Sequence, residues 1–180
     1  MRDIEGIEQV LEVLAPHWEA IHADFDVHNQ RFLQLANANH DVIGRVLKAH
    51  LVVESFLNTF LSSHYGISDL PEAKLSFFQK AKLLPDGASS AAFVKPGILQ
   101  LNAIRNKFGH NLDFEIKPSE GSAIYEVLSV ARSGSEFPSA VDAIEAFSPV
   151  ACAFLSVPPP HLQQLFMEAF SHVHTKTRVA

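Results

Sequence analysis

The sequence has only one cysteine, Cys152, so it cannot close a disulfide within one chain. It has no apolar run long enough to cross a bilayer, and its first eight residues carry acids where a secretion signal needs an apolar stretch. These absences predict a cytoplasmic protein in a reducing compartment, with no membrane partner.

Positive charge is also scarce, with 14 lysines and arginines against 20 acids and a formal net charge of −6. Proteins that coat nucleic acid are usually basic, because their binding depends on neutralising phosphates. The acidic balance argues against extended coating and leaves room for a small local basic site. The sequence has no glycine-rich phosphate loop, nucleophile elbow or cysteine–histidine cluster, so we expect no cofactor and no bound metal.

The 180 residues are 47% apolar and 19% charged, which is typical of one globular domain spanning residues 1–180. Helical spacing of apolar residues dominates and no Asn–Gly hairpin signal occurs, so the predicted class is all-α, with the phenylalanines in the core. Residues 122–132 fit a helix or a strand. The predicted helices cover residues 3–14, Pro16 to about 35, 42–63, Pro71 to Leu83, about 97–111, a segment from Pro138 interrupted at Pro149, and a last one from Pro158–Pro160.

The predicted helix at residues 97–111 carries the most specific set of candidate site residues in the sequence. Its apolar stripe includes Leu101, Ile104 and Phe108. Arg105 lies at the edge of this stripe, whereas Asn106 and His110 are four residues apart and share the opposite face. The spacing therefore predicts a surface Asn–His pair beside an arginine that leans toward the core.

The helix at residues 42–63 places His50 and Glu54 in the middle of its apolar face. A carboxylate there is costly unless it is paired and hydrogen-bonded. Arg105 is the cation that we expect to pair with Glu54, which predicts that the two helices pack together.

The segment from Arg105 through Asn106 to His110 resembles the ribonuclease motif of the HEPN superfamily. Residues 49–54 and 75–80 are similar to a subgroup that includes mannitol-operon-repressor-like proteins. The resemblance covers about residues 40–115 and none of residues 116–180. It implies an antiparallel helical bundle of the HEPN type, with additional C-terminal helices.

The resemblance also implies metal-independent cleavage of an RNA substrate, in which the 2′-hydroxyl of RNA is the nucleophile. His110 would take or give the proton, because the pKa of histidine lies near neutrality. Arg105 would stabilise the phosphorane-like charge through its planar fork of donors. Asn106 would orient a phosphate oxygen or His110.

Three further residues are expected to support this site, namely Glu54, His50 and Lys107. The resemblance implies a homodimer in which two such sites face each other, in a toxin or phage-defence effector with a cognate antitoxin or regulatory protein as partner. Toxins silenced by nucleotidylation carry a tyrosine two residues after the histidine. Here that position is Leu112, so we do not expect this form of control.

Structural roles compete with each of these assignments. Arg105 and Glu54 fit a structural ion pair, His110 fits a histidine interacting with the dipole at a helix C-terminus, and Asn106 fits a surface amide. His50 fits a core histidine with its hydrogen bonds satisfied. The competing functions are a non-enzymatic regulator resembling the mannitol-operon repressor, which acts through protein contacts, and a plain dimeric interaction module.

Overall fold

The computed structural model describes residues 6–36, 40–68, 70–111 and 114–175, and the regular elements in these ranges are helices, which confirms the all-α class. The chain divides into two compact units, residues 1–38 and 39–180, where the sequence predicted one domain. The predicted helix start at residues 3–5 and the residue Leu112 lie outside the described residues.

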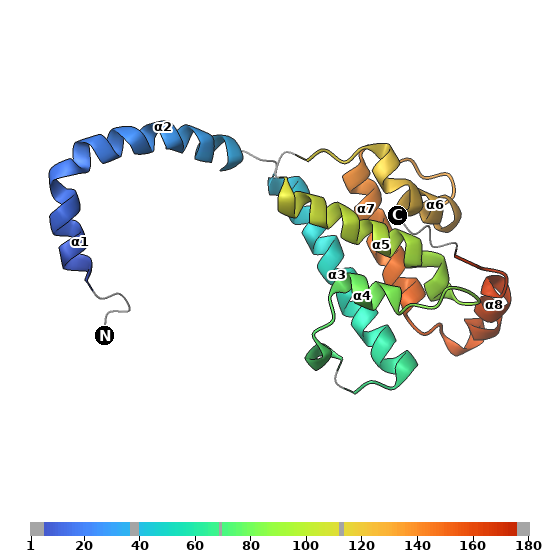
Figure 1. The fold of residues 1–180 in the computed structure, drawn as a ribbon. Helices are drawn as coiled ribbons and strands as arrows, with labels where there is room; N and C mark the ends of the chain where they lie inside the picture. The colour runs from blue at the N-terminus through green and yellow to red at the C-terminus, as the bar shows by residue number, and fades with distance from the viewer. Residues whose placement is uncertain (1–5, 37–39, 69, 112–113, 176–180) are drawn as a thin grey trace. The chain divides into compact units, whose positions relative to one another are not determined.

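The N-terminal unit consists of α1 (Ile7–Leu14), a 3-10 turn (Ala15–His17) and α2 (Trp18–Ala36), as Figure 1 shows. No residue of this unit whose side chain the structure describes is buried. Phe25, for example, is 61% exposed, so its prediction as a core residue is wrong. The side chains of Phe32 and Leu35, predicted on the same helix, lie outside the description.

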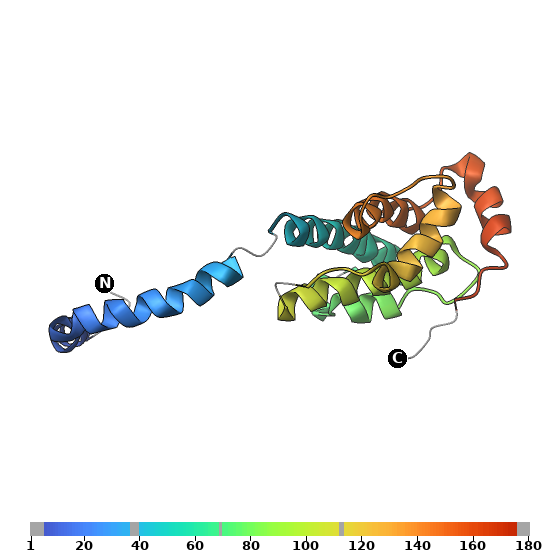
Figure 2. The same cartoon turned by 90° about the horizontal axis from the view of Figure 1, so that it is seen from above.

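The second unit is built on long helices that the shorter ones cover (Figures 1 and 2). The long helices are α3 (His40–Tyr65), α5 (Ser90–His110) and α7 (Ala140–Leu155). The shorter elements are α4 (Phe77–Lys82), α6 (Ser122–Ala131), α8 (Pro160–Phe170) and 3-10 turns at Pro71–Ala73 and Pro118–Gly121. Residues 122–132, for which the sequence left two alternatives, are thus helical.

Polar contacts fix the directions of the long helices. Near the start of α3, Arg45 Nη2 donates to Asp142 and to Glu145 near the start of α7, each at 2.5 Å. At the other end of α7, the Ser90 hydroxyl at the start of α5 donates to the Phe154 carbonyl at 2.8 Å. Therefore α3 and α7 run in the same direction, and α5 runs antiparallel to both (Figures 1 and 2).

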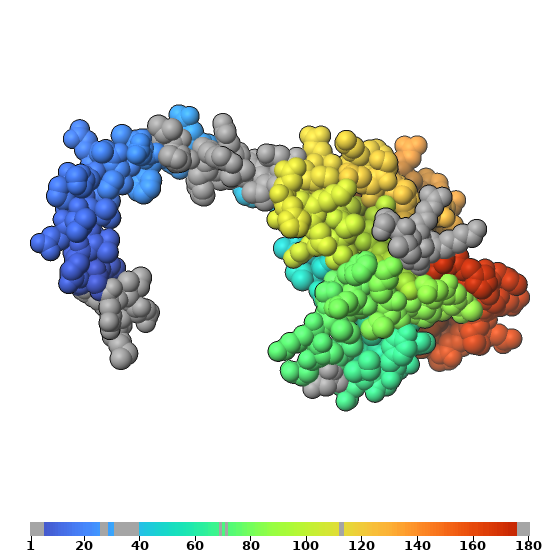
Figure 3. All heavy atoms as spheres, in the orientation of Figure 1, coloured from blue at the N-terminus to red at the C-terminus, as the bar shows by residue number. Residues whose placement is uncertain are grey.

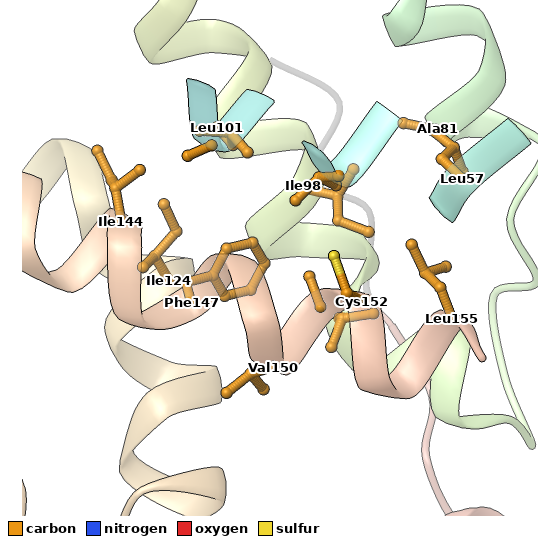
Figure 4. Close-up of a cluster of buried hydrophobic side chains, with 14 of the residues drawn as sticks. Leu57, Ala81, Ile98, Leu101, Ile124, Ile144, Phe147, Val150, Cys152 and Leu155 are labelled. Atoms are coloured by element: carbon orange, nitrogen blue, oxygen red, sulfur yellow. The ribbon is translucent and has the colours of Figure 1, made fainter. Parts of the chain in front are cut away.

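The core lies between these helices, where Phe147 of α7 points toward Ile98 of α5 (Figure 4). A Cβ at Gly97 would lie 2.5 Å from the Phe147 ring, so only glycine permits this approach. The two helices continue through Pro96 and Pro149, so the predicted interruption at Pro149 is wrong and α5 begins earlier than predicted. Each proline removes one backbone donor, and buried packing on both sides holds the helix across it.

The helix predicted from Pro71 to Leu83 begins later in the structure, at Phe77, and therefore turns different side chains toward the core. Ser76 caps α4, because its hydroxyl accepts from the Gln79 backbone while the Gln79 side chain accepts from the Ser76 backbone. This start turns Phe77 and Lys80 inward and leaves Phe78 49% exposed. The sequence predicted Phe78 as an inward residue, which is wrong because the helix begins at the cap and not at Pro71.

Hydrogen bonds join residues 173–175, at the end of the described chain, to residues 86–88 in the turn between α4 and α5. We call this contact the clip. The Ala88 amide donates to the Val173 carbonyl at 2.9 Å, and the Thr175 amide donates to the Asp86 carbonyl at 2.9 Å. Lys95 Nζ, almost fully buried, donates to the carbonyls of Lys82 and Leu84 and to the Asp86 carboxylate. The clip and this lysine together fix the entry into α5.

None of the described helices is by itself long and apolar enough to cross a membrane, and only α7 with α8, bent by 106°, pass that test as a pair.

Candidate functional site

The last two turns of α5 carry the residues that the sequence singled out. Arg105, Asn106 and His110 are all exposed there, and the C-terminal part of α5 reaches the surface in the space-filling view (yellow in Figure 3). Arg105 Nη1 donates to Asn106 Oδ1 at 3.2 Å. The Asn111 amide closes the helix by donating to the Lys107 carbonyl at 2.9 Å. The structure therefore places the three predicted residues near one helix end and links two of them directly.

Arg105 is not the partner of Glu54, so that prediction is wrong. Glu54 Oε1 accepts from Lys80 Nζ at 2.9 Å, and the two side chains are 25% and 10% exposed. The reason is the register of α4, whose cap turns Lys80 inward beside α3. The partly buried carboxylate of Glu54 is thus paired with Lys80, and Arg105 is left exposed.

His50 lies behind this face and is only 5% exposed. Its ring stacks on Phe77 with centroids 4.0 Å apart, and Nε2 donates to Asn102 Oδ1 at 3.4 Å. Burial is the main factor that lowers the pKa of His50, and the positive charge of Arg105 adds a smaller effect. The imidazole is therefore neutral near pH 7, which leaves Nδ1 as an acceptor with no hydrogen-bond partner in the described part of the chain.

Asn102 connects this buried histidine with the exposed face. It is 8% exposed and lies one helical turn before Asn106 on α5. Asn102 and Lys80 were not among the residues predicted from the sequence. The signals were present, because Asn102 and Asn106 are four residues apart and because Ser76 and Gln79 have capping-box spacing, which sets the face of Lys80.

The side chain of Lys107 contacts Glu120 and Phe114. Its ammonium donates to Glu120 and lies 5.2 Å from the centroid of the Phe114 ring. This ammonium and the Lys117 backbone amide, which donates at 2.9 Å, hold the pKa of the Glu120 carboxyl below its usual range. The charge of Lys107 is thus largely offset by Glu120, so it adds little to the positive charge around Arg105.

The guanidinium of Arg105 differs from that of Arg45 in its ion-pair partners. No carboxylate among the described residues lies within ion-pair distance of it, whereas Arg45 is held by Asp142 and Glu145. An exposed, planar fork of this kind suits a phosphate, because it donates two parallel hydrogen bonds to two oxygens. His110, exposed in the last turn, carries an imidazole ring with one proton-donating and one proton-accepting nitrogen in its neutral form.

Comparison of the chain with protein-family models, curated proteins and solved structures gave no match. In the ranges that the structure describes, no group of three or more histidine, cysteine or acidic side chains is placed to hold a metal ion.

The pairing of Glu54 predicts a specific pattern of coupling. Lys80→Met should destabilise the fold by about 1–3 kcal/mol, because it leaves a partly buried carboxylate without its cation, and Glu54→Gln should recover part of that loss. Arg105→Met serves as the matched control and should add to Glu54→Gln within about 0.5 kcal/mol. Urea unfolding of the single and double variants measures both cycles. Coupling of Glu54 with Arg105 instead of Lys80 would contradict the assigned pair.

Proposed function

We propose that this chain is a metal-independent endoribonuclease of the HEPN type that acts through Arg105 and His110. One observation carries the proposal: Arg105 is exposed, without a carboxylate partner in the described chain, beside the exposed Asn106 and His110. The pairing of Glu54 with Lys80 removes the structural role that competed for Arg105.

The chemistry follows from these groups. The 2′-oxygen attacks the adjacent phosphorus as its proton leaves to a base, and the bond from phosphorus to the 5′-oxygen breaks as that oxygen gains a proton. The products are a 2′,3′-cyclic phosphate and a 5′-hydroxyl. Arg105 binds the non-bridging oxygens as charge develops on them, Asn106 holds the guanidinium or a phosphate oxygen, and His110 moves a proton.

The reaction needs both a proton acceptor and a proton donor, and each chain supplies one His110. A homodimer with two α5 ends facing each other would supply two histidines and two arginines to one phosphate. This arrangement would also double a positive charge that is modest in one copy, which suits a chain with net charge −6.

The proposal predicts that structured RNA is cut in the presence of a chelator and that the cut stops when the 2′-hydroxyl at the cleaved position is replaced by hydrogen. The 2′-hydroxyl is the nucleophile, so its removal stops the attack. Gel analysis of a labelled RNA with one deoxy substitution measures this. A second substitution several nucleotides away is the control and should leave cleavage intact.

The end groups give an independent readout, since a 2′,3′-cyclic phosphate forms only if the 2′-oxygen attacks. Cleavage of the deoxy-substituted position, or loss of all cleavage on chelation, would contradict the mechanism.

A second candidate is a non-enzymatic regulator that acts through protein contacts. The exposed apolar side chains of the N-terminal unit favour it, because Val13 and Phe25 are more than half exposed. Absence of cleavage across a broad pool of structured RNAs would favour this regulator over the nuclease.

A further inference from the structure

The N-terminal unit carries an apolar stripe that no other residue of this unit covers, among those that the structure describes. Leu11 is 52% and Phe25 61% exposed, and even Trp18 is 37% exposed. Figure 3 shows α1 and α2 as a segment one helix thick. Exposed apolar side chains in such number mark a contact surface. The stripe consists of Ile7, Leu11, Leu14, Trp18, Ile21 and Phe25.

The spacing along the stripe alternates between four and three residues, which is a heptad repeat. This alternation keeps the apolar side chains on one side of a helix and matches the corresponding stripe of another helix. In the sequence the same spacing extends to Ile4 on one side and to His28, Phe32 and Leu35 on the other. The surface is therefore suited to a helical partner.

The acids of this segment avoid the stripe, and four of the seven recur at every seventh position. Glu5, Glu12, Glu19 and Asp26 each follow a stripe position of the heptad by one residue, about 100° around the helix. Residues 1–38 contain seven acids and two arginines. Helices that lie on membranes carry lysine and arginine on their polar face, so the charge pattern argues against an anionic bilayer as the occupant.

We propose that the stripe pairs with the same stripe of a second copy, in antiparallel orientation, so that α1 of each copy lies along α2 of the other. A two-fold pair matches one surface to itself. Five of the seven acids precede residue 20, so a parallel pair would align them, whereas an antiparallel pair sets them against the half that has only two acids and Arg31, which reduces the repulsion.

The exposed side chains of the stripe supply part of the area that a stable pair needs. Trp18 is 37% and Phe25 61% exposed, so each can still bury roughly 100 Å², and two copies contribute on the order of 400 Å² from these residues. Stable interfaces bury about 1,200–2,000 Å² in total, and the four aliphatic side chains of each stripe supply much of the remainder.

Sedimentation velocity of the full chain at about 1–50 µM tests the pairing. The wild type should be dimeric, Leu11→Glu should weaken the dimer at least tenfold, and Val13→Glu should leave it unchanged. Val13 is the matched control, because it lies on the same helix, is 68% exposed and is off the stripe. A monomeric wild type, or equal effects of the two variants, would overturn the proposal. So would vesicle flotation that needs Leu11, because it would assign the stripe to a bilayer.

A nitroxide label tests the orientation. Gln9 is exposed on α1 and accepts the label as Gln9→Cys, while the buried Cys152 is shielded from it. Antiparallel pairing separates the two labels by at least about 14 residues along the segment, with the 3-10 turn at Ala15–His17 between them, which exceeds one interhelical spacing. A parallel pair would hold them about 10 Å apart, across one interhelical spacing, and that distance would overturn the proposed orientation.

Discussion

Replacing His110 by alanine should lower the rate of RNA cleavage by about 10²–10⁴-fold, the usual contribution of a positioned acid or base. The side chain is exposed in the last turn of α5, so its removal should leave the thermal midpoint nearly unchanged. Arg105→Ala should lower the rate by about 10²–10³-fold through loss of charge stabilisation, also without a change in stability, because Arg105 does not hold Glu54. Single-turnover cleavage and thermal unfolding measure the two effects separately.

The chain offers matched controls for both substitutions. His161 and Arg132 are exposed residues of the same types on other elements, at the start of α8 and the end of α6. Neither His161→Ala nor Arg132→Ala should change the cleavage rate more than twofold. If cleavage persists in the His110 and Arg105 variants at the level of these controls, the face at the end of α5 is not the active site.

The largest effect on stability is expected at Lys95. Its side chain is 3% exposed, and its ammonium donates to the Lys82 and Leu84 carbonyls, at 3.1 and 2.6 Å. Lys95→Met would leave two acceptors without this donor, at a cost of about 1–3 kcal/mol each, so the free energy of unfolding should fall by roughly 2–6 kcal/mol. The exposed Asp86 carboxylate adds little, because water solvates it once the lysine is gone.

Thermal and urea unfolding of the full chain test this prediction, and a fall in Tm of about 10 °C is expected. Lys82→Met is the control, because this lysine is exposed on α4 and its ammonium lies 5.4 Å from the Phe78 ring centroid. It should change stability by less than about 0.5 kcal/mol. Equal losses in the two variants would mean that the buried hydrogen bonds of Lys95 do not stabilise the turn.

The class and the long helices could be predicted from periodicity, because apolar spacing is a local signal. The helix predicted at residues 42–63 is α3, found at His40–Tyr65, and the proline-initiated last helix is α8. The errors lie where tertiary packing overrides local signals. Pro149 reads as a helix breaker, and buried contacts on both sides carry α7 through it.

In the candidate site, too, local features could be predicted and tertiary contacts could not. The shared position of Arg105, Asn106 and His110 near one helix end follows from helix geometry, and the exposure of Asn106 and His110 was predicted with it. The partner of Glu54 could not be read in this way, because it depends on a cap one helix away that decides which side chain of α4 turns inward. The exposure of the apolar residues on α1 and α2 was missed because their spacing fits a core helix and a heptad equally well.

The clip between Asp86 and Thr175 has a consequence for how the chain acquires its structure during synthesis. Its two sides are 89 positions apart, so a ribosome that has made the α4–α5 turn must add nearly ninety residues before the turn gains its last hydrogen bonds. Chains fold from the N-terminus as they emerge, at about 5–20 residues per second. The turn that leads into α5 therefore lacks the hydrogen bonds of the clip for several seconds on each nascent chain, while Lys95 can already bond to Lys82, Leu84 and Asp86.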